Sequence, residues 1–157
     1  MKHPIPAAKT LGLSVAICLG LGSLSGLAVR GRNLTWYAQL AKPTFTPPSF
    51  LFGPVWTVLY VLMGIALALI WQRREGNQAL LLLFAVQLLL NLAWSPIFFY
   101  YQRIGLALIT LILLLLSIIA CIALAWRHKD ITLLLAPYLL WVSFAGILNA
   151  SIFILNF

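Results

Sequence analysis

Charged residues are absent from five long stretches of this sequence, and that pattern constrains the fold more than any other feature. The stretches cover residues 10–29, 43–72, 76–102, 104–126 and 131–157, and all twelve charged residues of the 157 lie outside them. Each stretch has at least 20 residues, the length that an apolar helix needs to cross the hydrocarbon core of a bilayer. We therefore expect an all-α integral membrane bundle of five transmembrane helices, and the pattern excludes a soluble enzyme.

The connections between the stretches set the expected helix bounds. Three connections are short, so the helices that they join are antiparallel neighbours. The first is long, and its three prolines and five aromatic residues indicate an ordered lid rather than a flexible linker, with an interfacial aromatic belt as the alternative. We expect one domain over 1–157, with helices at about 10–29, 52–72, 78–100, 104–126 and 131–155 and the lid at about 30–51.

The basic residues are spread over the ends of the stretches. They form no patch, so the net charge of +8 does not indicate a nucleic-acid partner. Six of the ten lysines and arginines lie on the side of the N-terminus, which favours a cytoplasmic N-terminus. Five apolar helices fit a bacterial inner membrane better than an outer membrane, whose spanning proteins are barrels. Residues 1–29 also resemble a cleaved signal peptide, but their apolar run exceeds a signal core, and we expect a retained first helix.

Small residues recur at every fourth position in the first stretch, at Ser14, Cys18, Gly22 and Gly26. They share one helix face and let another helix approach closely, either within the chain or in a homodimer. Both cysteines lie inside apolar stretches and are interpreted as packing residues. Both histidines lie outside the stretches, so the sequence predicts no metal site and no axial haem ligand.

Polar and aromatic side chains recur on one face of three expected helices. In the third helix, Gln87, Asn91 and Ser95 are four residues apart, with Trp94 beside them. The second and fifth helices carry further rings, amides and small residues: Trp56, Tyr60, Tyr138, Trp141, Ala145, Leu148 and Asn149. A polar group that faces lipid is costly, so these faces are expected to point into the bundle. They form either hydrogen bonds between helices or, as we favour, a pocket for a flat hydrophobic ligand.

Four blocks of the sequence carry specific motifs in a fixed order. They read Trp36-Tyr37-x-x-Leu40-x-Lys42-Pro43-x-x-x-Pro47-Pro48, Gly53-Pro54-Val55-Trp56-x-x-Leu59-Tyr60, Asn91-x-x-Trp94-Ser95-Pro96-Ile97-Phe98-Phe99 and Pro137-Tyr138-x-x-Trp141-x-x-Phe144-Ala145-Gly146-x-Leu148-Asn149. Over about residues 10–157 the chain resembles the TspO/MBR family of tryptophan-rich sensory proteins. The animal members of that family are the translocator protein, or peripheral benzodiazepine receptor.

The resemblance implies a five-helix bundle with a ligand cavity under the first loop, often as a homodimer. The ligands that it implies are tetrapyrroles (porphyrin, haem or bilin), sterol or lipid, and synthetic isoquinoline carboxamides and benzodiazepines, with no required cofactor. By motif position the cavity is lined by Trp56, Tyr60, Asn91, Trp94, Ser95, Trp141, Ala145 and Leu148. Four residues of the first loop close it: Trp36, Tyr37, Pro47 and Phe52.

Two departures from the family pattern concern sterols and the fourth helix. Animal members end the fifth helix with a Tyr followed by an Arg, and residues 148–157 contain neither, which puts that sterol site in doubt. Residues 34–42 fit a loose sterol pattern. The inward acid that many members carry in the fourth helix is missing from residues 104–126.

Three functions remain open on the sequence alone. The favoured one is a receptor or carrier in which a tetrapyrrole stacks on Trp56 and Trp141, with Arg30, Arg32 or Lys42 at its propionates. The alternative is photo-oxidative degradation of protoporphyrin, in which the two indoles are redox partners. The second alternative is a membrane interaction or regulatory protein. No charged side chain lies inside a span, which argues against ion pumps, proton-coupled exporters and hydrolases.

Overall fold

The computed structural model describes residues 6–157, with the side chain of Arg32 left out. In chain order the elements are α1 (Ala8–Gly26), α2 (Arg32–Gln39), the short 3-10 helix η1 (Ser49–Leu51), α3 (Phe52–Gln72), α4 (Gln78–Ser95), the π-helical turn η2 (Pro96–Tyr100), α5 (Ile104–Leu124) and α6 (Lys129–Asn156). Every element in the described residues is a helix. The expected all-α class is confirmed.

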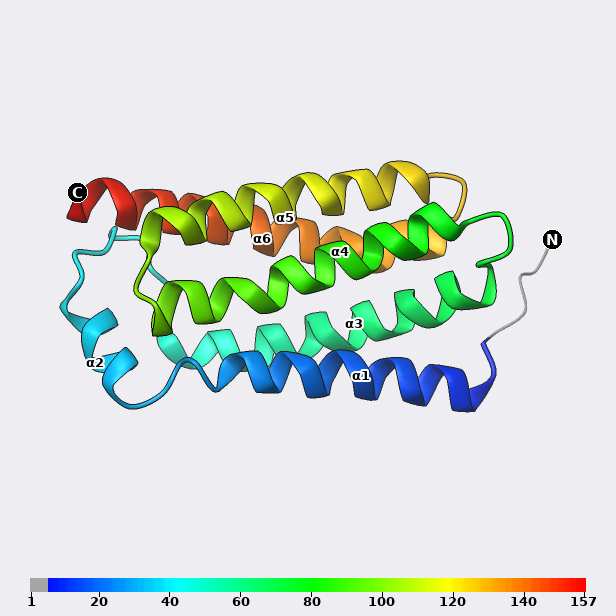
Figure 1. Cartoon of the computed structure of the whole chain (residues 1–157), viewed down its shortest axis with the longest axis horizontal. Helices are drawn as coiled ribbons and strands as arrows, with labels where there is room; N and C mark the ends of the chain where they lie inside the picture. Colours follow the sequence, from blue (N-terminus) through cyan, green and yellow to red (C-terminus); the bar gives the residue numbers. More distant parts are fainter. Residues whose placement is uncertain (1–5) are drawn as a thin grey trace.

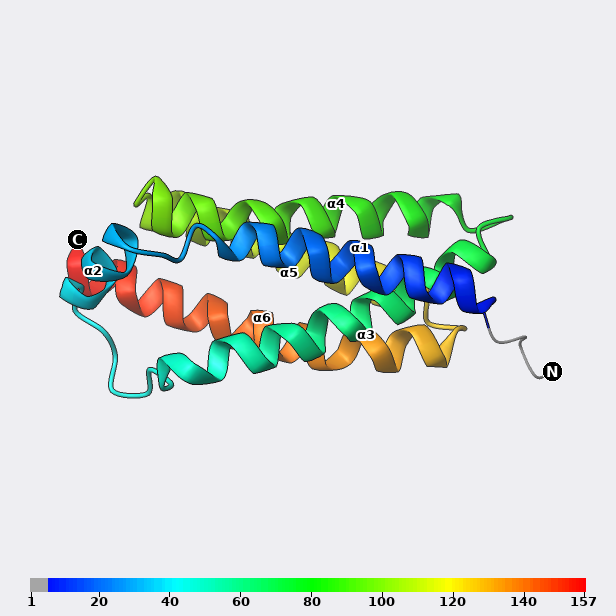
Figure 2. The same ribbon diagram turned by 90° about the horizontal axis from the view of Figure 1, so that it is seen from below.

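Five helices are long and apolar enough to cross a membrane, and they form one bundle. Helix α1 packs mainly on α3, α4 on α5, α5 on α6, and α3 on α6. Two views at right angles show all five running along the same axis, with α2 at the end of the bundle where α6 finishes (Figures 1 and 2). The protein is therefore a multi-pass integral membrane protein.

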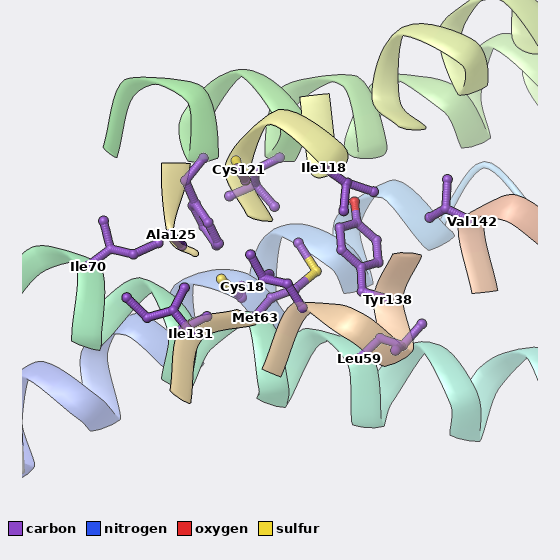
Figure 3. Packing of buried hydrophobic residues seen from close by; sticks show 14 of the residues in the cluster. Cys18, Leu59, Met63, Ile70, Ile118, Cys121, Ala125, Ile131, Tyr138 and Val142 are labelled. Carbon is purple, nitrogen blue, oxygen red and sulfur yellow. The ribbon is translucent and has the colours of Figure 1, made fainter. Parts of the chain in front are cut away.

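The core of the bundle lies between the middle turns of the long helices. Cys18 of α1, Met63 of α3 and Tyr138 of α6 meet there, each without exposed surface (Figure 3). Cys121 of α5 is buried to the same degree, and both cysteines are free thiols. They serve as small packing residues, as the sequence predicted.

Two glycines allow α1 and α3 to pack at close range. A Cβ atom on Gly22 would lie 2.2 Å from the ring of Tyr60, and one on Gly64 would lie 2.5 Å from the Cα atom of Val15. Of the small-residue stripe in α1, Ser14, Cys18 and Gly22 are buried within the chain, whereas Gly26 is exposed. The stripe therefore packs against its own chain over most of its length.

The first loop is more structured than the sequence indicated. Residues 32–39 form the helix α2, which the apolar pattern does not reveal because it has only eight residues. The ammonium of Lys42 closes its end by donating to the carbonyl oxygens of Tyr37, Ala38 and Leu40 at 2.8, 3.1 and 2.9 Å. These bonds satisfy carbonyls that a helix end leaves without an intrahelical partner.

An ion pair joins two helices at the opposite end of the bundle. The guanidinium of Arg73, just after α3, donates to both carboxylate oxygens of Asp130 at the start of α6, at 2.9 and 2.5 Å. The connections between α3 and α4 and between α5 and α6, around which six of the twelve charged residues lie, therefore meet at one end of the bundle. This agrees with the antiparallel arrangement that the short connections imply.

Candidate ligand-binding cavity

A cavity of about 730 Å³ lies inside the bundle beneath the first loop. Helices α1, α3, α4 and α6 form its walls, the turn η2 adds two rings, and α2 with the loop after it forms its lid. Helix α5 contributes no lining residue within the described part of the chain. The volume falls within the range of about 300–1,000 Å³ that is typical of small-molecule sites.

The floor of the cavity is a hydrogen-bonded chain across three helices. The Tyr60 hydroxyl of α3 donates to Oδ1 of Asn91 at 2.6 Å. Nδ2 of Asn91, in α4, donates to the hydroxyl oxygen of Tyr138 in α6 at 3.0 Å. All three residues are buried, so the bonds lie in a medium of low dielectric where they are strong and costly to lose. Asn91 thereby fixes the spacing of α3, α4 and α6.

A second amide organises the wall toward α5. Nε1 of Trp94 donates to Oδ1 of Asn149 at 3.1 Å, and Nδ2 of Asn149 donates to the carbonyl of Ile104 at 3.1 Å. The opposite wall is tied by Ser25 of α1, whose hydroxyl donates to the carbonyl of Leu92 at 2.8 Å. These bonds hold α1, α4, α5 and α6 around the cavity while leaving the face of the Trp94 indole in the lining.

Seven aromatic residues belong to the lining of the cavity. Trp56 lies beside Tyr60 with ring centroids 5.6 Å apart, and Trp94 lies beside Phe98 at 5.5 Å. Phe52 stands at the mouth of the cavity, at the start of α3. Two indoles and several phenyl rings thus border the same space, and a lining of this composition suits flat hydrophobic molecules.

The lid carries few groups that could meet an acidic ligand. Burial raises the pKa of the Tyr37 phenol above its ordinary value, so this lining group is neutral at physiological pH. Lys42 also lines the cavity, but its ammonium already donates to three backbone carbonyls. Arg30 is exposed and is not part of the lining, and the side chain of Arg32 lies outside the described residues.

Eleven of the fifteen residues that the sequence proposed for ligand binding line the cavity. They are Tyr37, Pro47, Phe52, Trp56, Tyr60, Asn91, Trp94, Ser95, Ala145, Leu148 and Asn149. Residues of five separate chain segments therefore converge on one space: α2, the loop after it, α3, α4 and α6.

The other four proposed residues lie outside the lining. Trp36 turns from α2 toward Phe98, with ring centroids 5.8 Å apart. Gln87 and Tyr138 are buried in the core and do not face the open space. The amide of Gln87 makes no hydrogen bond among the described residues.

Trp141 lies behind Phe52 as seen from the cavity. Their ring centroids are 5.9 Å apart, and Phe52 rather than Trp141 belongs to the lining. Trp141 instead lines a separate apolar groove of about 520 Å³ between α3 and α6. Val58 and Leu140 of that groove are largely exposed, so it lies on the outer surface of the bundle. In this structure Trp56 borders the cavity and Trp141 borders the outer groove, so the two indoles that the sequence analysis placed together do not line one space.

The sequence analysis missed two parts of the lining. Helix α1 contributes five residues, Leu19, Gly22, Ser23, Ser25 and Gly26, and Val29 follows just after its end. Its small residues were interpreted only as a packing stripe. Small side chains also leave space next to the helix, and here that space belongs to the cavity. Phe98 and Phe99 line the cavity because Pro96 begins a π-helical turn, which changes the direction of the side chains that follow.

The lining can bind and orient a ligand, but it holds no pair of groups for acid–base or nucleophilic chemistry. Among the described residues, no three His, Cys, Asp or Glu side chains are grouped so that they could hold a metal ion. The chemical groups in the lining are aromatic rings, two amides, a few hydroxyls and the ammonium of Lys42, which bonds backbone carbonyls.

Comparisons with known proteins agree with this architecture. A sequence profile of the TspO/MBR family matches residues 14–155. The chain is 42% identical over 153 residues to the tryptophan-rich protein TspO of Chlorobaculum tepidum, covering 94% of this chain and 96% of that protein. It is 40% identical to the protein of the same name from Archaeoglobus fulgidus, covering 91% and 94%. It is 39% identical to the translocator protein of Bos taurus, covering 92% and 88%. Because the family profile and these relatives match nearly the whole chain, and the chain has five candidate membrane spans, it belongs to the TspO/MBR family.

Proposed function

We propose that this protein is a membrane receptor or carrier that binds tetrapyrroles and other flat hydrophobic molecules in the cavity beneath its lid. The observation that carries the proposal is the composition of the lining: two indoles, Trp56 and Trp94, together with neutral hydrogen-bonding groups such as those of Tyr60 and Asn91. A planar macrocycle can stack on the indoles while its pyrrole or lactam edges meet hydroxyls and amides. No axial ligand is expected, because neither histidine belongs to a span.

The names of relatives fit a carrier or a sensor. Proteins that match this chain are named translocator protein and tryptophan-rich sensory protein. Either role requires reversible binding inside the membrane, and a cavity with a lid at one end of the bundle supplies the means. The homodimer, the inner membrane and the cytoplasmic N-terminus remain part of the proposal.

Light-dependent breakdown of protoporphyrin is the second candidate, and one feature favours it. A porphyrin in the cavity would lie against the indoles of Trp56 and Trp94, both of which line it. The bound pigment would supply the photochemistry, and the chain would position it and limit the access of oxygen.

Titration of the protein in lipid nanodiscs with protoporphyrin IX, haem and biliverdin tests the proposal. In the dark, tryptophan fluorescence should be quenched saturably by at least one of them, and empty nanodiscs should show only linear partition. If the second candidate holds, illumination of the protoporphyrin complex should yield a new product faster than illumination of the free pigment does. If only the receptor holds, the two rates should be equal. Quenching that never saturates with any of the three pigments would reject the receptor.

A further inference from the structure

Among the described residues, the lid is joined by hydrogen bonds to the far end of the chain through one residue, Asn156. The amide N–H of Ala41 donates to Oδ1 of Asn156 at 3.0 Å, and Nδ2 of Asn156 donates to the carbonyl of Ala41 at 2.9 Å. Within residues 6–157, these are the hydrogen bonds that connect the loop before α3 to an element distant in sequence. Both belong to one side chain in the last turn of α6.

The geometry of this contact suits an asparagine. Its amide presents one donor and one acceptor side by side, and the N–H and C=O of Ala41 present the complementary pair. Nδ2 of Asn156 also donates to the carbonyl of Ile152 at 2.7 Å, which orients the amide on its own helix. An aspartate could keep the bond from the Ala41 N–H but could not donate to its carbonyl.

Ala41 is a stiff point of attachment. It lies between Leu40, which ends α2, and Lys42, whose ammonium bonds three carbonyls of that helix end. A restraint on Ala41 therefore acts on α2 as a unit, including Tyr37, which lines the cavity. On the other side of the contact, Ile152 lines the cavity one turn before Asn156. The contact thus lies at the rim of the cavity.

The other contacts between the lid and the bundle are apolar: Leu40 packs on the buried cluster that includes Phe98 and Ile152, and several rings meet. Trp36 contacts Phe98 at a centroid distance of 5.8 Å, Tyr37 contacts Phe99 at 5.4 Å, and Phe45 contacts Phe144 at 6.4 Å. Such contacts are only weakly directional, and at a membrane surface lipid chains can replace the rings that are lost. Asn156 therefore supplies the directional bonds between the lid and α6.

We propose that Asn156 is the latch of the cavity: its amide holds Ala41, and with it α2, over the opening, and its release admits or frees the ligand. The identity of that ligand rests on the proposed function, whereas the latch itself does not. Asn156 is a positioning residue in this account, since it does not line the cavity.

A reporter thiol tests the latch without any ligand. Ala145 lines the cavity, and the native Cys18 and Cys121 are fully buried, so a maleimide should label an Ala145→Cys variant chiefly at the new thiol. Adding Asn156→Ala removes both bonds to Ala41 and should raise the labelling rate about tenfold, and Asn156→Asp should raise it less. Asn77→Ala is the matched control, because Asn77 donates to the carbonyl of Arg73 in the connection at the opposite end. It should leave the rate unchanged.

Stopped-flow quenching by protoporphyrin IX then tests the gate, in variants that keep Ala145. Asn156→Ala should raise both the association rate and the dissociation rate of protoporphyrin IX. The factor by which Kd changes should be smaller than the factor by which either rate changes. A labelling rate equal to that of the parent protein in Asn156→Ala would overturn the latch. Faster labelling with unchanged protoporphyrin rates would show that the ligand does not pass the lid, and would overturn the gate. Faster labelling in a protein that never binds protoporphyrin saturably would leave the latch standing and reject the proposed function.

Discussion

The floor of the cavity is closed by side chains that bond to one another across helices, whereas its lid is closed by side chains that bond to the backbone. In the floor, Asn91 accepts from Tyr60 and donates to Tyr138, with all three buried. In the lid, Asn156 pairs with the backbone of Ala41, and both bonds are exposed.

This difference indicates that the floor sets the shape of the site and that the lid can move. A buried bond between helices cannot be exchanged for a bond to water, so breaking it leaves unpaired groups in the interior. An exposed bond at the bundle end can be exchanged for water at little cost. We therefore expect mutations in the floor to change stability and affinity, and mutations in the lid to change rates.

Among the predicted substitutions, a change at Gly22 should cause the largest loss of stability, because it disturbs Tyr60 in the floor of the cavity. The new Cβ atom of Gly22→Ala would overlap the ring of Tyr60, which is held by its bond to Asn91 and by the Trp56 ring beside it. Overpacking of this kind costs about 1–3 kcal/mol, and we expect thermal denaturation in detergent to show a loss near the upper end of that range.

Gly26→Ala is the matched control for Gly22→Ala. Gly26 lies one turn further along the same helix face, and a Cβ atom there would meet nothing within 4 Å. Equal losses of stability in the two variants would contradict the close approach of α1 to Tyr60, and would indicate a general sensitivity of α1 to alanine.

The two amides of the third span sharpen the comparison within one helix. Asn91→Leu removes the shared partner of Tyr60 and Tyr138 and should lower the free energy of unfolding by about 1–2 kcal/mol, in the range of interhelical bonds in membranes. Gln87→Leu, one turn away, removes an amide that makes no hydrogen bond in the described residues and should be neutral or stabilising. Equal destabilisation of the two variants by chemical unfolding would contradict this assignment.

The two tryptophans near Phe52 separate the cavity from the outer groove. Trp56→Phe removes an indole from the lining and should weaken protoporphyrin binding about tenfold, a change of about 1.4 kcal/mol. Trp141→Phe changes a ring that lies behind Phe52 and should weaken it less than threefold, on the order of 0.6 kcal/mol or below. Fluorescence titrations in nanodiscs measure both, and the reverse order would place the ligand in the groove.

The smallest effect is expected in the lid. Lys42→Met removes the ammonium that closes the end of α2 and should increase hydrogen exchange of residues 37–42 in the free protein. Because those bonds are partly exposed, the cost in stability should be about 1 kcal/mol or less. If Lys42 instead binds a propionate, the variant will weaken binding of protoporphyrin but not of its dimethyl ester.

Most of the fold was predictable from the sequence, because the physical signal is strong. A run of apolar residues without charge has few stable forms in a bilayer other than a helix, so the five spans could be located from charge alone. The helix α2 could not, since eight residues of mixed polarity carry no such signal and the helix depends on the Lys42 cap.

The candidate site was predictable where periodicity alone decides which way a side chain faces. Asn91 and Ser95 share a face of α4 and line the cavity. Gln87 shares that face but lies too deep, and Trp141 is covered by Phe52 from another helix. How deep a residue lies in the bundle, and whether a side chain of another helix covers it, depend on the tertiary structure. The spacing of residues within one segment does not determine either property. The α1 wall was missed for the same reason, since the close approach of Gly22 is to Tyr60 of another helix.

Filling the cavity tests the central claim most directly. Ala145→Phe places a ring inside the lining, and Leu140→Phe places the same ring in the outer groove between α3 and α6. Dark titration of the two variants with protoporphyrin IX in nanodiscs should show binding lost in Ala145→Phe and retained in Leu140→Phe, with both proteins folded by circular dichroism. Binding that survives in Ala145→Phe and is lost in Leu140→Phe would contradict a site beneath the lid.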